Sequence, residues 1–323
     1  MKRFNFVLVT LVLTLVCVSA EAQFSNRIRN AIQNSAENAA TRKAEEKTDE
    51  VVSREADKGF ERAEEGIAKG EAEAEKGLNK LADAIEEGQK AQEEADAKAD
   101  GIISEIPEVG NEPYTPSESE FAFFAMKKGS VQVSVSKDAK GKITGQTRST
   151  IKDITGARDA FAIAYASEAL DAKGNPADKN NPLILNYRII VKNSVMYLDM
   201  KGMFGTMQGL DGVQVSGTAM KLPVNMTVGQ TLDDAAAKVR IGFINCSAIM
   251  TEGKCVAIED VTVEAGTFHC YKVSQKVNVT AMGIRNEGTT LTWYAKGVGA
   301  VKTESYDKNG KLQSSQELIA NKS

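Results

Sequence analysis

Alternating apolar and polar residues run through the last part of the chain, from Ile258 to Leu318. The apolar positions recur every second residue and are separated by short turns centred on glycine, which is the pattern of half-buried strands. Similar stretches occur upstream at Phe121–Met126, Val131–Ser136, Ile143–Ile154, Ala160–Leu170, Leu183–Val191, Val195–Asp199, Gln214–Met220, Val239–Ile249 and Val256–Val263. The pattern predicts a mainly β domain over residues 117–323, built as an antiparallel curved sheet or half-barrel.

Three of the turns share the sequence Asp-x-x-Gly, at Asp138–Gly141, Asp171–Gly174 and Asp307–Gly310. In such a turn the aspartate accepts hydrogen bonds from the turn backbone, and glycine takes the left-handed conformation. The acidic ligands of a calcium loop are missing after each first aspartate, so these segments predict hairpins and no metal site.

One stretch departs from the period of a strand. Its apolar residues are spaced 4, 3, 4 and 3 apart, with a phenylalanine beside them, as on one helical face; they are Met196, Met200, Met203, Met207 and Leu210, with Phe204. This spacing predicts a short Met-rich helix over about Asp199–Leu210, weakened by Gly202, Gly205 and Gly209. A methionine face against a sheet would either line a site for a lipid or another apolar ligand, or fill the core of the sheet.

Residues 23–106 form a separate, acidic region. It lacks proline before Pro107 and is rich in Ala, Glu and Lys, which favours helix. A narrow apolar stripe follows Phe60, Ile67, Leu78, Leu81 and Ile85. We expect a long α-helical or partly disordered arm that either contacts a helical partner through this stripe, acts as a spacer, or remains a solvated single helix.

The ends of this arm are marked by other signals. Residues 1–22 have a basic start, an apolar run and small residues at Ala20 and Ala22, which predicts a cleavable secretory signal; Cys17 offers an alternative as a lipid attachment site. Residues 107–116 contain three prolines and predict a hinge before the β domain. No later apolar stretch is long enough to span a membrane. These features predict an exported protein, periplasmic or secreted.

Charge and chemistry narrow the function. Residues 41–100 hold 11 Lys and Arg against 19 Asp and Glu, a net charge of −8, and no strongly basic region is left to bind nucleic acid. His269 is the single histidine of the chain and lies in a strand pattern beside Tyr271, as expected of a hydrogen-bonded structural residue. The sequence therefore predicts no enzyme, no cofactor and no metal site.

Three cysteines follow the signal region: Cys246, Cys255 and Cys270. An exported protein can form disulfides, so two of these cysteines could form a disulfide and leave one free thiol. Alternatively, all three could be small buried apolar residues. A hairpin across Glu252 and Gly253 would place Cys255 opposite Met250, which gives no support to a bridge between Cys246 and Cys255.

Several of these segments carry a family resemblance. Glu264–Lys272, Trp293–Lys302 and Tyr306–Leu312 resemble the C-terminal signature of the TapB-like family of uncharacterised exported bacterial proteins, and Phe121–Gly145 and Leu222–Leu232 resemble its opening and its middle. The resemblance covers residues 117–320, about two thirds of the chain. It implies an exported β-rich fold similar to the half-barrels of lipoprotein carriers, and it implies no catalytic residue.

Two functions follow as hypotheses. The first is a non-catalytic protein of the cell envelope whose β domain binds a lipophilic ligand or a protein partner. The second is a structural or assembly protein that acts through the helical arm.

Overall fold

The computed structural model describes residues 86–117, 120–176, 182–203, 213–241 and 244–322. A helix spans residues 86–100 and a 3-10 helix, η2, spans Lys201–Met203. The strands are β1 (Val131–Asp138), β2 (Ile143–Ala157), β3 (Ala160–Leu170), β4 (Ile184–Lys192), β5 (Val195–Asp199), β6 (Gln214–Gly217), β7 (Lys221–Pro223), β8 (Ala235–Ile241), β9 (Ile244–Val263), β10 (Gly266–Ala281), β11 (Ile284–Ala295), β12 (Gly299–Asp307) and β13 (Leu312–Lys322). The expected mainly β class is confirmed.

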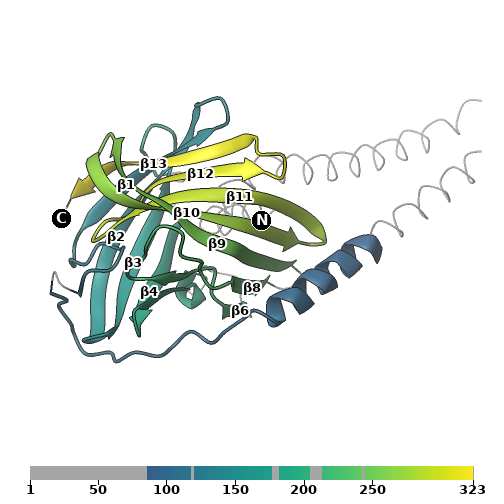
Figure 1. Cartoon of the computed structure of the whole chain (residues 1–323), viewed down its shortest axis with the longest axis horizontal. Coiled ribbons are helices and arrows are strands. Elements are labelled where there is room, and N and C mark those ends of the chain that lie inside the picture. The colour runs from purple at the N-terminus through teal and green to yellow at the C-terminus, as the bar shows by residue number, and fades with distance from the viewer. Residues whose placement is uncertain (1–85, 118–119, 177–181, 204–212, 242–243, 323) are drawn as a thin grey trace, which may run out of the picture.

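All the strands belong to one antiparallel sheet, in the order β6-β8-β9-β10-β11-β12-β13-β1-β2-β3-β4-β5-β7. The two outermost strands, β6 and β7, are consecutive in the chain and are joined only by Thr218, Ala219 and Met220. Because so short a link must connect the two edges, the sheet curls strongly about one axis (Figure 1). It therefore has an inner, concave face and an outer, convex face.

Thr218 joins the two edges of the curled sheet. Its backbone N–H donates to the carbonyl of Ala236 in β8 at 2.9 Å, and its hydroxyl accepts from the N–H of Leu198 in β5 at 3.0 Å. The hydroxyl oxygen also lies 2.8 Å from the carbonyl oxygen of Met220 and 3.1 Å from that of Leu198. A side chain thus replaces the backbone ladder between β5 and β8.

The long strand β9 corrects one prediction. The chain does not form a hairpin at Glu252 and Gly253; it continues as a single strand of 20 residues with an irregularity there. Glu252 has a φ of 54°, and the N–H of Leu232 donates to the carbonyl of Gly253 at 2.8 Å. A glycine inside a strand pattern is compatible with a turn or a bulge. Here it forms a bulge, because β9 pairs with the continuous strand β10 on both sides of Glu252 and Gly253.

The three Asp-x-x-Gly turns are confirmed and share one geometry. In each, the aspartate carboxylate accepts two backbone N–H bonds of 2.8 to 3.0 Å, and the glycine N–H donates to the aspartate carbonyl. The turns end β1, β3 and β12, which run in the same direction because β1 shares an antiparallel neighbour with each of the others. All three turns therefore lie on one rim of the sheet, called here the Asp-turn rim.

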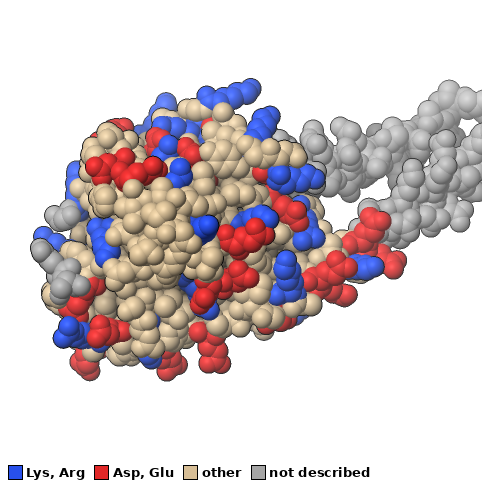
Figure 2. All heavy atoms as spheres, in the orientation of Figure 1, with Lys and Arg blue, Asp and Glu red and all other residues tan. Residues whose placement is uncertain are grey.

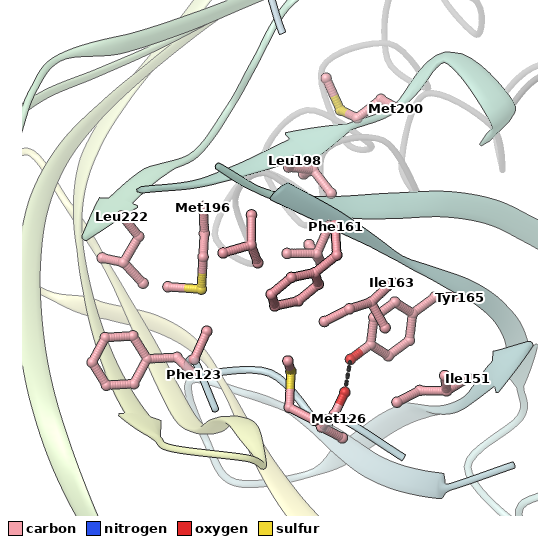
Figure 3. Close-up of a cluster of buried hydrophobic side chains, with 14 of the residues drawn as sticks. Phe123, Met126, Ile151, Phe161, Ile163, Tyr165, Met196, Leu198, Met200 and Leu222 are labelled. Atoms are coloured by element: carbon pink, nitrogen blue, oxygen red, sulfur yellow. Dashed lines mark hydrogen bonds between the residues drawn. The ribbon is translucent and has the colours of Figure 1, made fainter. Parts of the chain in front are cut away.

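The segment Phe121–Met126 is not a strand, which is a second correction. It crosses the inside of the curled sheet and contributes Ala122, Phe123, Ala125 and Met126 to the main hydrophobic core. Phe123 is fully buried among core side chains (Figure 3). Its ring centroid lies 4.9 Å from that of Tyr271 in β10 and 6.1 Å from that of Tyr294 in β11. A run of consecutive apolar residues suits a buried strand and a core-filling segment equally well.

The helix of residues 86–100 packs against the outer face of β8 and β9. Ala99, Ile102 and Ile103 cover Ala236 and Ile249, whose chain neighbours Ala235 and Ala248 belong to an inner cluster. The side chain of Gln92 accepts from the N–H of Gly283 at 3.2 Å, and Ser247 donates to Asp96. The exposed side of the helix is acidic (Figure 2). The last part of the expected arm thus contacts the β domain.

Residues 107–116, expected to be a hinge, also lie against the sheet. They follow the rim opposite the Asp-turn rim, where the N–H of Gly156 donates to the carbonyl of Glu112 at 2.8 Å and Pro113 forms a bridge with Thr155. Lys192 donates to the carbonyl of Glu108 at 2.9 Å. A Cβ on Gly156 would lie 2.4 Å from the carbonyl oxygen of Ala160 in β3, so glycine permits the close approach of β2 and β3 beside the bonded strap. The prolines shape a docked strap (Figure 1).

We expect Thr218→Val to lower the free energy of unfolding by about 2 kcal/mol, because it leaves buried backbone groups of β5 without partners. Chemical denaturation measures this, and Thr218→Ser, which keeps the hydroxyl, is the control, with an expected change below about 0.5 kcal/mol. Equal stability of the valine and serine variants would show that the hydroxyl does not hold the two edges together.

We expect Gly283→Ala to release the helix of residues 86–100, since a Cβ there would lie 2.2 Å from the carbonyl oxygen of Gly88. Amide hydrogen exchange over residues 86–100 should become at least about tenfold faster. Gly310→Ala is the matched control: its φ of 75° is close to the 77° of Gly283, but no atom lies within 4 Å of its added Cβ. Equal exchange in both variants would contradict docking at this point.

Candidate functional site

The inner face of the sheet has an apolar zone formed by residues from β2–β5, β7 to β10 and the segment Phe121–Met126. Met196 in β5 and Met200, the residue after β5, are 0% and 1% exposed and pack in this zone with Phe161, Leu198 and Leu222 (Figure 3). Met126 and Met226 lie in the same cluster. Methionine is flexible and polarizable, so this zone can adjust its shape.

The predicted Met-rich helix is described only in part. Met196 belongs to a strand, and the described part of the helical segment is the turn η2, Lys201–Met203. Phe204, Met207 and Leu210 lie outside the described residues, as do the arm residues Phe60, Ile67, Leu78, Leu81 and Ile85. The spacing of 4 between Met196 and Met200 therefore came from a strand followed by a turn. An ion pair closes this strand end: Arg188 donates to the buried carboxylate of Asp199 through Nε at 3.0 Å and Nη2 at 2.7 Å.

Aromatic rings line the apolar zone. Tyr165 and Tyr187 stack with centroids 5.2 Å apart, and Phe124 contacts Tyr165 and Tyr294 at 6.4 and 6.3 Å. Burial raises the pKa of the Tyr294 hydroxyl to about 12 and the pKa values of Tyr165 and Tyr187 above the usual 10.0. These hydroxyls are therefore neutral at physiological pH and serve as hydrogen-bonding groups.

A second zone of the inner face is polar and uncharged. It consists of hydroxyl and amide side chains on six strands and is called here the hydroxyl zone: Ser134 and Ser136 (β1), Thr147 and Ser149 (β2), Ser167 (β3), Thr290 and Thr292 (β11), Thr303 and Ser305 (β12), and Ser314 and Gln316 (β13). Residues that are paired across strands share a face. The registers join Thr290 to Ser305 to Ser314, and Thr292 to Thr303 to Gln316. The zone lies between the apolar zone and the Asp-turn rim.

Two tyrosines mark where the zones meet. Ser149 and Ser167 hydroxyls lie 2.7 Å apart, and Ser167 donates to the Tyr187 hydroxyl at 3.4 Å. Thr292 lies on the same face of β11 as Tyr294, and Tyr294 packs against the core. Sequence reasoning missed this zone, although its signal is visible: Ser, Thr or Gln recurs at every second residue of β1, β2, β11, β12 and β13.

Charged side chains gather on the outer face. Trp293 is covered by Lys272 and Lys302, whose Nζ atoms lie 4.7 and 5.0 Å from its ring, and its indole N–H donates to Glu259 at 2.7 Å. Lys137 pairs with Glu317 at 2.6 Å. Acidic and basic groups alternate over the visible face of the molecule (Figure 2). The outer face thus carries charged pairs over a smaller buried apolar cluster that includes Cys270, Trp293 and Val301, whereas the hydroxyl zone of the inner face carries no charge.

The other predicted chemistry falls outside this site. His269 is exposed and shares the strand face of Tyr271, with ring centroids 6.4 Å apart, and its Nδ1 lies 2.8 Å from Oδ1 of Asp260, so it is a hydrogen-bonded residue as expected. Within the described ranges, no three His, Cys, Asp or Glu side chains come together to hold a metal ion. None of the described helices is long and apolar enough to cross a membrane.

Comparisons with known proteins agree with this architecture. The DUF3108-like family model matches residues 127–318. A Bacteroides fragilis protein that is inferred to be exported and has a YmcC-like fold aligns with a TM-score of 0.52 and 20% identity, over 63% of this chain and 100% of its own. A Parabacteroides distasonis protein inferred to be a lipoprotein aligns with a TM-score of 0.50 and 22% identity, over 62% and 99%. The curated proteins contain no match. The resemblance to exported β-rich proteins is supported, but the TapB-like name is not confirmed.

The three described cysteines are free thiols. Burial, together with Asp96, raises the pKa of Cys246 to about 12, and burial with Asp260 and Glu259 raises the pKa of Cys270 to about 11. The pKa of Cys255 is raised by burial as well. Thiolate is the reactive form, so these side chains behave as small apolar groups.

We expect Cys246 and Cys270 in the folded protein to react with a thiol reagent at pH 8 at least about tenfold more slowly than after unfolding, because a raised pKa leaves the thiol neutral below about pH 11. Peptide mapping by mass spectrometry after alkylation measures each site. A disulfide between any two of the three residues would contradict this account.

Proposed function

Because the chain belongs to the DUF3108-like family and its sheet curls around an amphipathic inner face, we propose that it is an exported, non-catalytic protein of the cell envelope. Its β domain binds a lipophilic ligand on the inner face of the sheet. The observation that carries the proposal is the apolar zone around Phe123 and Met196, which continues on the same face into the hydroxyl zone. An apolar ligand surface with a few polar groups is the usual composition of small-molecule sites.

The segment Phe121–Met126 is the part of the inner face that gives way to a ligand. It forms no strand ladder, and it is held by side-chain packing, by the N–H of Gly297 donating to the Ala122 carbonyl at 2.8 Å, and by the Tyr165 hydroxyl donating to the Ala125 carbonyl at 3.4 Å (Figure 3). Displacing it breaks no strand pairing. A lipid chain that takes its place recovers the apolar burial that the segment loses.

Export is supported by residues 1–22, which have the pattern of a secretory signal, and by the inferred export of the Bacteroides fragilis protein. A non-catalytic role is supported by the described side chains of the apolar zone and the hydroxyl zone, which are apolar, hydroxyl, thiol or amide groups. Catalysis by acid, base or nucleophile needs an ionisable group with a tuned pKa beside the substrate.

A second role, in assembly through the N-terminal arm, is favoured by one observation. The helix of residues 86–100 is fixed to the outer face of β8 and β9 through Gln92, Asp96 and Ala99. A fixed attachment point would give residues 23–85 a defined exit from the β domain, and a partner protein would then be held at a set position.

We expect gently purified protein to carry a lipophilic molecule in about one-to-one ratio, because the inner face can bury one chain of a lipid. Native mass spectrometry before and after organic extraction measures the mass and identity of the ligand. A neutral fluorescent probe, N-phenyl-1-naphthylamine, should bind the extracted protein saturably. Protein that carries no lipid and binds no probe would contradict the proposal.

A further inference from the structure

We propose that the hydroxyl zone is a subsite for an uncharged head group that carries hydroxyl or ester oxygens, so that the ligand is a neutral lipid of the acylglycerol type. This inference rests on the proposed binding of a lipophilic ligand and adds the chemistry of its polar end. The site is built by β11, β12, β13, β1, β2 and β3 from residues that are far apart in the sequence.

The first observation is an unsatisfied hydroxyl. Ser305 is 0% exposed, and its Oγ has no hydrogen-bond partner in the part of the chain that the structure describes. Its cross-strand neighbours Thr290 and Ser314 lie on the same face. Burying a hydroxyl without a partner costs about 1–3 kcal/mol. Ser305 therefore occupies a position where alanine would be more stable unless a hydrogen-bonding group approaches it.

The second observation is the burial of the whole zone. Thr290 and Thr292 are each 9% exposed, and Ser134, Ser136 and Thr147 are half-buried. A solvated sheet face in an exported protein would carry charges, as the outer face does with Lys137, Glu317 and Lys302. A sheet face that only completed a core would be apolar. Half-buried neutral hydroxyls in a continuous row suit a surface that faces a polar, uncharged ligand group.

The third observation decides the charge of that group. Serine and threonine hydroxyls and the Gln316 amide both donate and accept hydrogen bonds. A phosphate head group would instead need Arg or Lys beside it, and the registers place neither residue type at the inner-face positions of β1, β2, β3, β11, β12 and β13 between the apolar zone and the Asp-turn rim. The nearest rim carboxylates belong to Asp138 and Asp307, which pair in register with Ser314 and Gly288. They would repel an anion further.

One ligand would contact both the apolar zone and the hydroxyl zone, because the two zones meet on the same face of the sheet. Tyr187 contacts Ser167 on the polar side and stacks on Tyr165 on the apolar side. Tyr294 is the equivalent residue on β11, next to Thr292 on the same face and in contact with Phe123 and Phe124. A molecule with its acyl chain against Phe123 and Met196 would therefore present its glycerol oxygens to Thr290, Thr292 and Ser305.

The test compares two lipids with the same acyl chain. Isothermal titration of the extracted, purified full-length protein with 1-oleoylglycerol and with 1-oleoyl lysophosphatidic acid, each below its critical micelle concentration, measures the effect of the phosphate alone. We expect the neutral lipid to bind at least about tenfold more tightly, since a desolvated phosphate finds no cationic partner in the site. N-phenyl-1-naphthylamine reports the apolar zone independently.

Matched variants locate the head group. Ser305→Ala combined with Thr290→Val should weaken the binding of 1-oleoylglycerol about tenfold or more, because two hydrogen bonds are lost. The affinity for the neutral probe N-phenyl-1-naphthylamine should not change. Ser315→Ala, which removes a hydroxyl from the opposite face of β13, should change neither. Thermal melting of each variant checks the fold, and the comparison of the two lipids on the unmodified protein needs no variant.

The outcomes separate the two proposals. Tighter binding of the neutral lipid, lost in the double variant, supports the subsite. Equal or tighter binding of the lysophosphatidic acid, or unchanged binding by the double variant, overturns the subsite while the proposed lipophilic function stands. Failure of both lipids and of the probe to bind overturns the proposed function together with this inference.

Discussion

The architecture depends on how the sheet buries its inner face. A single sheet has no second layer to cover it, and here the covering comes from the sheet's own curvature and from the segment Phe121–Met126. Phe123 contacts Tyr271 and Tyr294 on one wall, while Phe124 reaches Tyr165 on the other. The curl is maintained by Thr218, which replaces a strand ladder between β5 and β8. Burial of aromatic area and one short link therefore set the shape together.

The curvature and the segment Phe121–Met126 cover only part of the inner face with apolar side chains. Towards the Asp-turn rim the same face continues as hydroxyls, and towards the opposite rim it is closed by the strap of residues 107–116, which bonds Gly156 and Lys192. The result is a polarity gradient along the strands from core to rim. Such a gradient has no evident use in a core alone, but it matches the two ends of an amphipathic molecule.

The sequence pattern predicts the elements that are determined by local residues. It fails for segments whose structure is determined by contacts with residues far away in the sequence. The bounds of Ala160–Leu170 and Val195–Asp199 and the three Asp-x-x-Gly turns agree with the structure because alternation and turn chemistry are local. Phe121–Met126 and the Glu252–Gly253 bulge were misassigned because a core-filling segment and a bulge are selected by their partners. The spacing between Met196 and Met200 combined a strand with the residue that follows it. The hydroxyl zone was missed because its Ser and Thr residues become one surface only through strand pairing.

A crystal structure of the protein with bound 1-oleoylglycerol tests the central claim most directly, since that claim concerns which face holds which part of a ligand. We predict electron density for the acyl chain against Phe123 and Met196, a displaced Phe121–Met126 segment, and glycerol oxygens within hydrogen-bond distance of Thr290 and Ser305. An unchanged interior with the lipid bound on the outer face, beside Trp293 or the helix of residues 86–100, would contradict the account.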